Sequence, residues 1–425
     1  MPKKAREMSQ VEQAKTCIYC GLSRPFSDEH VFPAGLGADD RRFLLKDMVC
    51  GVCNSGVFSK LETKFMRASP VAIARLYFQP TGRGKGKKAS IPSINTNSTI
   101  VFLEPHGVVE AEMTAGGKLI TLLQLLFLED DKVALTGGDH VGIDVFLDAL
   151  IAALENQIQV VEKIKDVVPS RFVVETFEWD GARYHSVSRE TTPTLPPKRV
   201  WREPLASPPA AAATARAPTL YQRTDGQLCL RVPPSTQAGP MLTRARKAPS
   251  VFGKQEGVPY SDFANPSVHI SMTIDMKDYA RVLAKIGVNF VAHAYQEQYA
   301  RHHAFNRIKT AILEGLSPIW LQTIPKQADA FTGVPRTRHV AMLHFTKSRA
   351  GRFHAGMVIR LYGGTTQYVH LSENALQPPD GPAILVIDYE NHRIERFFDW
   401  GSFGAVYPPN VLPDFKTLDE FSLDG

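Results

Sequence analysis

The stretches CIYCGLSRPFSDEHVFPAGLG, residues 17–37, and CGVCN, residues 50–54, decide the architecture of the first part of this chain. Each holds a C-x-x-C pair, and 29 residues separate the two pairs. A C-x-x-C turn brings two sulfurs to one side, and two such turns complete a tetrahedral four-thiolate zinc site. Such a closed shell leaves the metal no open position for catalysis. We therefore predict a structural Zn²⁺ ion whose ligands are Cys17, Cys20, Cys50 and Cys53.

Length and composition describe an ordinary globular protein. The chain has 425 residues, of which 44% are hydrophobic and 22% charged, and this length favours two or three domains. The longest apolar-rich stretch, residues 119–128, is far shorter than the roughly 20 residues that a membrane-spanning helix needs. Residues 1–15 are charged and lack the apolar core of a signal peptide. We expect a cytoplasmic protein without a membrane partner, in which clustered cysteines favour metal binding over disulfides.

Positive charge is concentrated near the N-terminus. Residues 1–90 carry sixteen Lys and Arg against eight Asp and Glu, whereas the whole chain has a net charge of only +6. A local excess of basic residues is the footprint of a polyanion partner. A solvated basic surface is an equally good interpretation of the same excess.

The predicted fold class is α+β, with a small zinc-stapled ββα module followed by a mixed α/β region that contains an antiparallel sheet. Within the later regions we expect a helix over 144–167, a hairpin turning at Asp180–Gly181, a long amphipathic helix over 275–302 and several strands of one sheet after 339. The expected boundaries are a flexible leader (1–15), the cysteine module (16–78), a basic Gly/Lys linker (79–96), an α/β middle region (97–185), a Pro/Ala-rich connector (186–254) and a C-terminal α/β region (255–425). The connector is expected to lack fixed structure, with room for one short ordered piece at GQLCLRVP, residues 226–233.

The segment between the cysteine pairs presents an acid–histidine pair. DEHVFP places His30 at the start of a β-favouring run, and the chain then turns back toward the second cysteine pair. After Asn54 the pattern is helical, with Phe58, Leu61 and Phe65 on one side. The order is strand, turn, strand and helix, with a histidine on the first strand and an asparagine just before the helix.

This arrangement resembles the HNH endonuclease superfamily, the ββα-metal nucleases, in the form that carries four cysteines. The resemblance rests on CIYC, DEHVFP, GLG and VCGVCNSGVFSKLE and covers about residues 17–65. More weakly, the C-terminal half is similar to the region that accompanies such modules in larger bacterial proteins. The resemblance implies a metal-dependent hydrolase that cleaves phosphodiester bonds, with DNA as the expected partner.

The resemblance also implies residue roles. His30 matches the general base that draws a proton from water, and Asn54 matches the asparagine that orients the base. Glu29 matches an acidic ligand of a single catalytic divalent ion, Mg²⁺ or Mn²⁺, which stabilises the leaving oxygen. The second protein ligand should follow Asn54 by eight or nine residues, where this chain has Glu62 and Thr63; Glu62 is the better ligand for a hard cation.

Interpretations of these residues without a catalytic role stay open. The acid–histidine pair could be a solvated turn, Asn54 a helix N-cap and Glu62 a surface residue. Cys229 is expected to be an unpaired thiol without a role. One rival to the endonuclease is a non-catalytic zinc module that binds nucleic acid or protein. Another is a dormant nuclease effector of an anti-phage defence system, gated by a ligand or protein at its C-terminal region.

Overall fold

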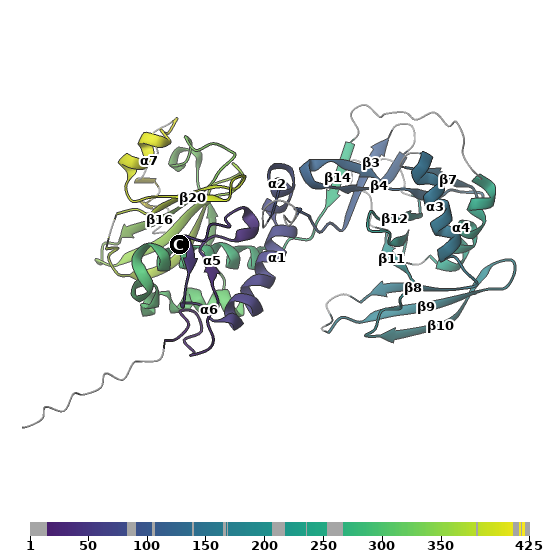
Figure 1. The fold of residues 1–425 in the computed structure, drawn as a ribbon, viewed down its shortest axis with the longest axis horizontal. Coiled ribbons are helices and arrows are strands. Elements are labelled where there is room, and N and C mark those ends of the chain that lie inside the picture. Colours follow the sequence, from purple (N-terminus) through teal and green to yellow (C-terminus); the bar gives the residue numbers. More distant parts are fainter. Residues whose placement is uncertain are drawn as a thin grey trace, which may run out of the picture. The chain divides into compact units, whose positions relative to one another are not determined.

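The computed structural model describes residues 15–82, 91–103, 107–137, 140–164, 167, 169–205, 217–234, 236–252, 267–379, 381–410, 416–417 and 419–420. The chain forms two compact units (Figure 1). The first contains the residues up to Asn95, residues 115–117 and the chain from Thr273 onward; the second contains Thr96–Thr114 and Lys118–Met272. Both combine helices with largely antiparallel sheets, so the predicted α+β class is confirmed.

The cysteine module has the predicted ββα layout. Strand β1 (Glu29–His30) pairs antiparallel with β2 (Leu44–Leu45). The helical segment begins with a π-helical turn, η2 (Val52–Phe58), and continues as α1 (Ser59–Arg67). Because the helical backbone starts inside the second cysteine pair, Asn54 is not an N-cap. The remaining elements of the module are η1 (Ala34–Leu36) and α2 (Pro70–Phe78).

The C-terminal part of the first unit is a six-stranded antiparallel sheet with helices on both faces. Its strand order is β15-β18-β17-β16-β19-β20, which confirms the single sheet expected after residue 339. Alternate residues of β16 face opposite cores, with Ala341 and Leu343 toward α5 and Val340 and Met342 toward α7. The strands are β15 (Leu321–Thr323), β16 (His339–Lys347), β17 (Phe353–Arg360), β18 (Gln367–Ala375), β19 (Ile384–Asp388) and β20 (Arg393–Phe397), and the helices are α5 (Met276–Arg301), η5 (His303–Phe305), α6 (Asn306–Glu314), η6 (Lys326–Ala328) and α7 (Trp400–Val406).

One hydrophobic core joins the cysteine module to α5 and the sheet. Gly37 shows how close the approach is: at its φ of +79°, a Cβ atom would lie 2.6 Å from the Cα of Tyr389, so only glycine is accommodated. The fully buried His339 adds a polar link, since its Nε2 donates to the carbonyl of Leu36 and its Nδ1 accepts from the amide of Tyr362, both at 3.1 Å. The module and the C-terminal region, which we predicted as separate domains, therefore belong to one compact unit with a shared core.

The second unit contains two sheets, ordered β10-β9-β8-β11-β13-β12-β6-β7 and β14-β3-β4-β5. The predicted hairpin turn at Asp180–Gly181 is present, with Gly181 at a φ of +100°. The elements are β3 (Ser98–Leu103), β4 (Gly107–Met113), β5 (Leu119–Thr121), β6 (Gln124–Phe127), β7 (Val133–Thr136), α3 (His140–Ala153), β8 (Gln157–Lys163), β9 (Phe172–Trp179), β10 (Tyr184–Thr192), β11 (Val200–Pro204), β12 (Thr219–Gln222), β13 (Leu228–Val232), α4 (Ala238–Phe252) and β14 (Ser267–Ser271); η4 (Ala115–Gly117) belongs to the first unit.

Two predictions for this part of the chain were wrong. The segment 186–254, expected to lack fixed structure, contributes β11, β12, β13 and α4. Its average composition hides short buried runs, such as Leu220–Tyr221 in β12. The piece GQLCLRVP, where some order was expected, contains β13, and Cys229 is fully buried there. The helix expected over 144–167 ends at Ala153, because the β-branched run that follows forms β8.

Parts of other predictions lie outside the described residues. These parts are residues 1–14 of the leader, residues 83–90 of the basic linker and residues 206–216 of the connector. Among the helices that are described, none has the length and apolar character required to cross a bilayer.

Candidate active site and metal centre

The four cysteines of the two C-x-x-C pairs converge as predicted. Their sulfurs all lie within 4.8 Å of one another, and among the described residues no other group of three or more His, Cys, Asp and Glu is so close. Cys17, Cys50 and Cys53 are buried, and the Sγ atoms of Cys20 and Cys50 are 3.8 Å apart. Four clustered thiols in this spacing fit a tetrahedral zinc ion.

The backbone around the sulfurs supports a metal site. The amide of Cys50 donates to the Sγ of Cys17 at 3.4 Å, and Gly21, at a φ of +69°, closes the first turn by donating to the carbonyl of Cys17. The hydrogen bond with Cys53 lowers the pKa of the Cys17 thiol to about 4, while its partner Cys53 has a raised pKa because it gives that hydrogen bond. A lowered thiol pKa favours the thiolate, which is the form that binds a metal.

His30 lies at the edge of the module, with 19% of its side chain exposed. Its Nε2 faces the Oδ1 of Asp39 at 3.4 Å. A carboxylate at this distance orients the imidazole ring. Asp39 follows the GLG turn, and no sequence pattern marked it as a partner of His30.

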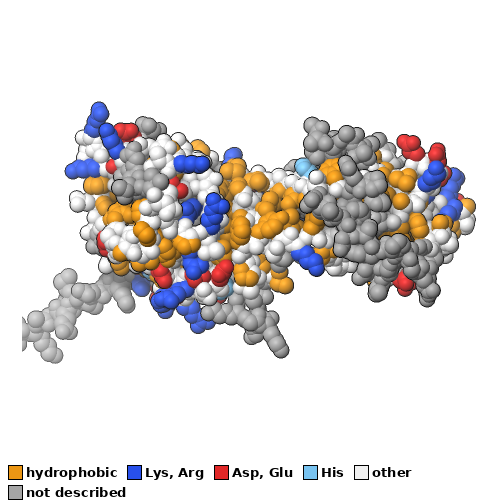
Figure 2. Space-filling model, turned by 90° about the horizontal axis from the view of Figure 1, so that it is seen from above, with side chains coloured by type: hydrophobic (Ala, Val, Ile, Leu, Met, Phe, Trp, Pro, Cys, Tyr) orange, Lys and Arg blue, Asp and Glu red, His pale blue; other side chains and the backbone are white. Residues whose placement is uncertain are grey.

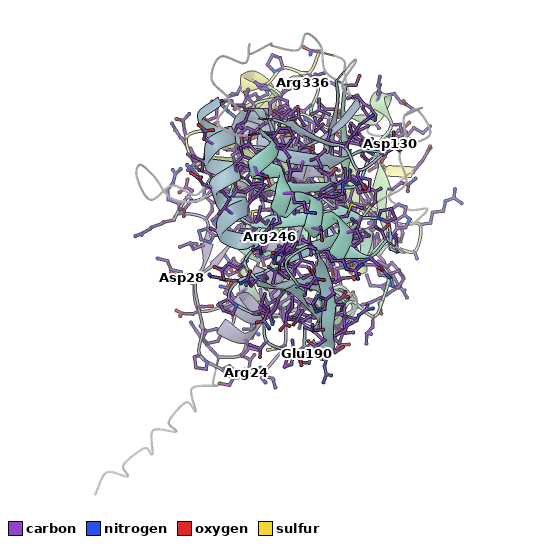
Figure 3. All side chains as sticks on the ribbon, turned by 90° about the vertical axis from the view of Figure 1, so that its right-hand side faces the viewer. Arg24, Asp28, Asp130, Glu190, Arg246 and Arg336 are labelled. Carbon is purple, nitrogen blue, oxygen red and sulfur yellow. The ribbon has the colours of Figure 1, made fainter. Side chains whose placement is uncertain are left out.

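Asn54 fixes the chain just before β1. Its Nδ2 donates to the carbonyl of Asp28 at 2.9 Å and to the Oγ of Ser27 at 3.1 Å. Asp28 itself is exposed and lies at the outside of the molecule in Figure 3. Because Asn54 directly follows the second cysteine pair, it links the cysteine cluster to the strand that carries Glu29 and His30.

Glu29 and Glu62 come together, and a lysine lies between them. The Nζ of Lys285 contacts the Oε1 of Glu29 and lies 2.6 Å from the Oε1 of Glu62. The side chains of Glu29 and Lys285 are only 5% and 1% exposed, and that of Glu62 is 19% exposed. Thr63, the other candidate ligand, donates instead to the carbonyl of Ser59. Of these two candidate ligands, Glu62 faces Glu29 across Lys285, whereas Thr63 does not.

The side chains of Glu29 and His30 have different surroundings, since adjacent residues of a strand point to opposite sides. Glu29 points toward α5, where it also accepts a hydrogen bond from the Nδ2 of Asn289 at 2.9 Å. His30 is joined to the same asparagine only through its backbone carbonyl. Glu29 and His30 are thus neighbours on one strand but do not converge on one metal-binding point.

Helix α5 supplies the residues that sequence reasoning missed. Lys285, Asn289 and His293 are spaced four apart and form one stripe on the helix. Asn289 accepts from the hydroxyl of Tyr19 at 2.6 Å, and the ring of His293 stacks on Phe43 with centroids 4.9 Å apart. Figure 1 shows α5 beside α1 in the first unit. The available signal was the four-residue spacing of these polar side chains within a helix predicted to be amphipathic.

This arrangement does not fit a divalent ion between Glu29 and Glu62, because the Lys285 ammonium fills that point. Burial alone would lower the pKa of Lys285, but the two carboxylates outweigh it and raise the pKa. Burial also raises the pKa of the Glu29 carboxyl, and the nearby ammonium offsets only part of this effect. The predicted catalytic Mg²⁺ or Mn²⁺ therefore has no place in this arrangement of the side chains.

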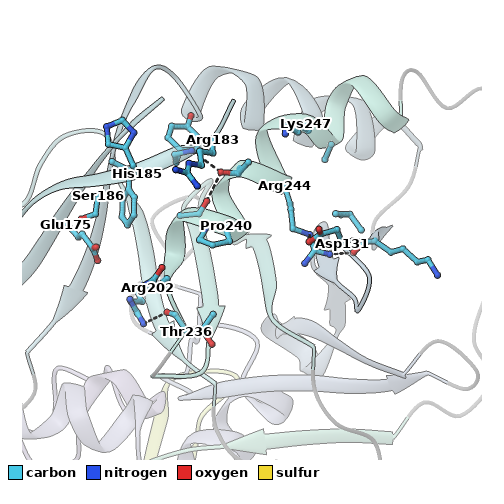
Figure 4. A pocket seen from close by; sticks show the side chains of 18 of the residues that line it. Asp131, Glu175, Arg183, His185, Ser186, Arg202, Thr236, Pro240, Arg244 and Lys247 are labelled. Carbon is cyan, nitrogen blue, oxygen red and sulfur yellow. Dashed lines mark hydrogen bonds and ion pairs between the residues drawn. The ribbon is translucent and has the colours of Figure 1, made fainter. Parts of the chain in front are cut away.

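A separate groove of about 1160 Å³ lies in the second unit. Figure 4 shows that its basic side chains come from several elements. Arg202 donates to the carbonyl of Thr236 at 2.8 Å and Arg244 to that of Leu128 at 2.9 Å, so both are held in place. The charged lining residues are Lys132, Arg183, Arg189, Arg202, Arg244 and Lys247, against Asp131, Glu162 and Glu175. This excess of positive charge suits an anionic ligand.

The basic residues of the first unit do not form one stripe on the face shown in Figure 2. Blue Lys and Arg side chains lie there among hydrophobic and acidic ones. Within the first unit, some basic side chains are paired with acids, as Arg42 is with Asp40 at 2.7 Å and Lys64 with Asp278 at 2.5 Å. On this face, the sequence excess of positive charge is therefore spread out.

The chain was compared with protein-family models, with curated proteins and with solved structures, and none of the three comparisons found a match. The candidate site therefore stands on its own residues: a four-cysteine cluster, a histidine with a carboxylate partner, and two glutamates that close on a lysine.

Proposed function

We propose that this chain is an endonuclease of the HNH type that hydrolyses phosphodiester bonds, with DNA as its substrate. One observation carries the proposal. Strand β1, held by the cysteine cluster and by Asn54, presents His30 at a partly exposed position with Asp39 against its ring. A histidine of this kind is suited to general-base work, since it is accessible, oriented and next to a group that stabilises its charged form.

The chemistry proposed for these residues is the hydrolysis of one P–O bond. His30 takes a proton from a water molecule while the water oxygen attacks phosphorus. The bond from phosphorus to the leaving 3′ oxygen then breaks, and that oxygen takes up a proton. Asp39 stabilises the imidazolium during this step. Asn54 acts as a positioning residue, because it holds the backbone two residues before His30.

The zinc cluster supports this site without taking part in the reaction. When bound, the ion would fix the ends of the segment that carries β1 and β2, because its four ligands flank that segment on both sides. Dependence on a second, divalent ion belongs to the proposal as well, but no step is assigned to such an ion while Lys285 lies between Glu29 and Glu62.

The anionic partner has a candidate docking surface in the second unit. Its groove carries more basic than acidic side chains, and Arg189 and Lys247 in it are exposed. Contacts of Lys and Arg with phosphates supply most of the salt-dependent affinity for nucleic acid. The groove supports nucleic-acid binding as part of the proposed function.

Cleavage of supercoiled plasmid tests the proposal. The full chain, loaded with zinc, is incubated in excess over DNA with Mg²⁺ or Mn²⁺, beside His30→Ala and a control, His303→Ala, at an exposed histidine. We expect nicking by the parent and the control that is lost in His30→Ala. The rival, a non-catalytic zinc module, is supported if DNA is bound but no cleavage depends on His30. This result must hold for the parent and also for a variant in which the Glu29–Lys285 ion pair has been removed.

A further inference from the structure

The two glutamates predicted as ligands of one ion are drawn together by a cation of the chain itself. Glu29 lies on β1 and Glu62 on α1, yet the Nζ of Lys285 contacts an oxygen of each. Lys285 comes from α5, 223 residues after Glu62. Both carboxylates thus face a shared point, and that point holds a positive charge.

We infer that Lys285 is an internal cation that takes the position where Glu29 and Glu62 would hold a divalent ion, and that it excludes such an ion from this point while it stays there. This inference rests on the proposed function for its meaning, since it describes how the same site is regulated. The exclusion depends on the Lys285 side chain alone. Its ammonium sits on a flexible four-carbon stem, so it can move away from Glu29 and Glu62 while α5 stays in place.

The charges of the cluster favour an exchange of cations. Two carboxylates and one ammonium leave one negative charge when all three are ionised, in a place that is almost fully buried at Glu29 and Lys285. A divalent ion would neutralise both carboxylates, and hard cations prefer carboxylate oxygens. Glu62 is 19% exposed, so an ion can approach from that side.

The rest of the contact between α5 and the module can persist during the exchange. Asn289 holds Glu29 and the carbonyl of His30 independently of Lys285. Phe65 stacks on Tyr279 with centroids 5.2 Å apart, and Lys64 pairs with Asp275 and Asp278 near the start of α5. These contacts keep Glu29 and Glu62 facing each other when the ammonium has left.

The first test measures metal binding rather than cleavage. Mn²⁺ is titrated by calorimetry into the zinc-loaded full chain, into Lys285→Met and into Lys285→Met combined with Glu29→Gln and Glu62→Gln. We expect Lys285→Met to bind Mn²⁺ at least tenfold more tightly than the parent, and the triple variant to lose this gain. Equal affinity of the parent and a folded Lys285→Met overturns the inference.

A second test keeps the parent sequence, in case Lys285→Met does not fold. Reductive methylation followed by mass spectrometry reports how accessible each lysine is. We expect Lys285 to be protected without Mn²⁺ and to become reactive at millimolar Mn²⁺, while the exposed Lys118 is modified equally in both conditions. Protection of Lys285 that Mn²⁺ leaves unchanged contradicts the inference.

The experiments distinguish failure of the nuclease proposal from failure of the inference about Lys285. Tight Mn²⁺ binding by Lys285→Met without any cleavage supports the internal cation and counts against the nuclease. Cleavage by the parent without added divalent ion, abolished in Lys285→Met, overturns the internal cation, because Lys285 would then belong to the working site.

Discussion

At the scale of single residues, the site is organised by hydrogen bonds that tie side chains to backbone groups. Asn54 is the clearest case, because one amide group connects the end of the second cysteine pair to the carbonyl of Asp28 and the hydroxyl of Ser27. Strand β1 has only two residues, which is too short to hold its own register. Asn54 therefore fixes the position of β1, which in a longer strand would be fixed by the backbone hydrogen bonds to the neighbouring strand.

Replacing Asn54 by alanine tests this role. The variant loses two hydrogen bonds, and we expect a loss of about 1–3 kcal/mol in the free energy of unfolding, since each bond contributes roughly 0.5–1.5 kcal/mol. Urea unfolding of the zinc-loaded protein measures it. Thr63→Ala is the control, because its hydroxyl only donates to a helix carbonyl. A stability equal to that of the parent would show that Asn54 does not pin β1.

At the scale of elements, two helices, α5 and α4, supply key side chains to the two candidate sites. Helix α5 crosses the cysteine module and carries Lys285, Asn289 and His293 to it, so the site described here is made by α5 as much as by the module. In the second unit, α4 and the β9–β10 hairpin line the basic groove, with Lys247 on the helix and Arg189 on β10.

Charge reversal in the groove tests whether it binds nucleic acid. We expect the double variant Arg189→Glu, Lys247→Glu to weaken DNA binding at least tenfold at low salt, and to reduce the dependence of affinity on salt concentration, because phosphate contacts are removed. Fluorescence anisotropy measures both effects. The matched control is Lys118→Glu with Lys163→Glu, two exposed positions of the same unit outside the groove. Equal losses in both double variants would mean that only overall charge matters.

At the scale of the whole molecule, the cysteine module shares its hydrophobic core with the C-terminal part of the first unit. Its apolar residues share one cluster with α5 and one face of the six-stranded sheet, and His339 bridges the sheet to the carbonyl of Leu36. Burial lowers the pKa of His339 to about 3. In the folded protein this imidazole therefore stays neutral at pH values where an unfolded histidine is already charged.

This depressed pKa makes stability depend on pH. Between the unfolded pKa near 6.5 and the folded value, the unfolded chain binds a proton that the folded chain does not, so stability falls as the pH falls through this window. We expect His339 to account for a loss of about 1.5 kcal/mol between pH 6.5 and pH 5. Unfolding of His339→Gln should show a weaker pH dependence, and His303→Gln should match the parent. An unchanged slope in His339→Gln would contradict the assignment.

The sequence predicted local features well, and contacts between distant segments poorly. The cysteine spacing, the β1–β2 hairpin and the turn at Gly181 each depend on a few neighbouring residues, whose chemistry admits little choice. The position of Lys285 depends instead on how α5 packs across the module, which periodicity cannot supply. Segment 186–254 was misjudged for a related reason, because its buried strands gain their stability from partners such as β6 and β8.

The measurement that tests the central claim most directly is plasmid cleavage by three zinc-loaded chains in Mn²⁺: the parent, Lys285→Met, and Lys285→Met combined with His30→Ala. The account predicts that Lys285→Met nicks DNA at least tenfold faster than the parent, and that the added His30→Ala abolishes the gain. A folded Lys285→Met that binds Mn²⁺ and leaves DNA intact, or one whose cleavage persists without His30, would contradict it.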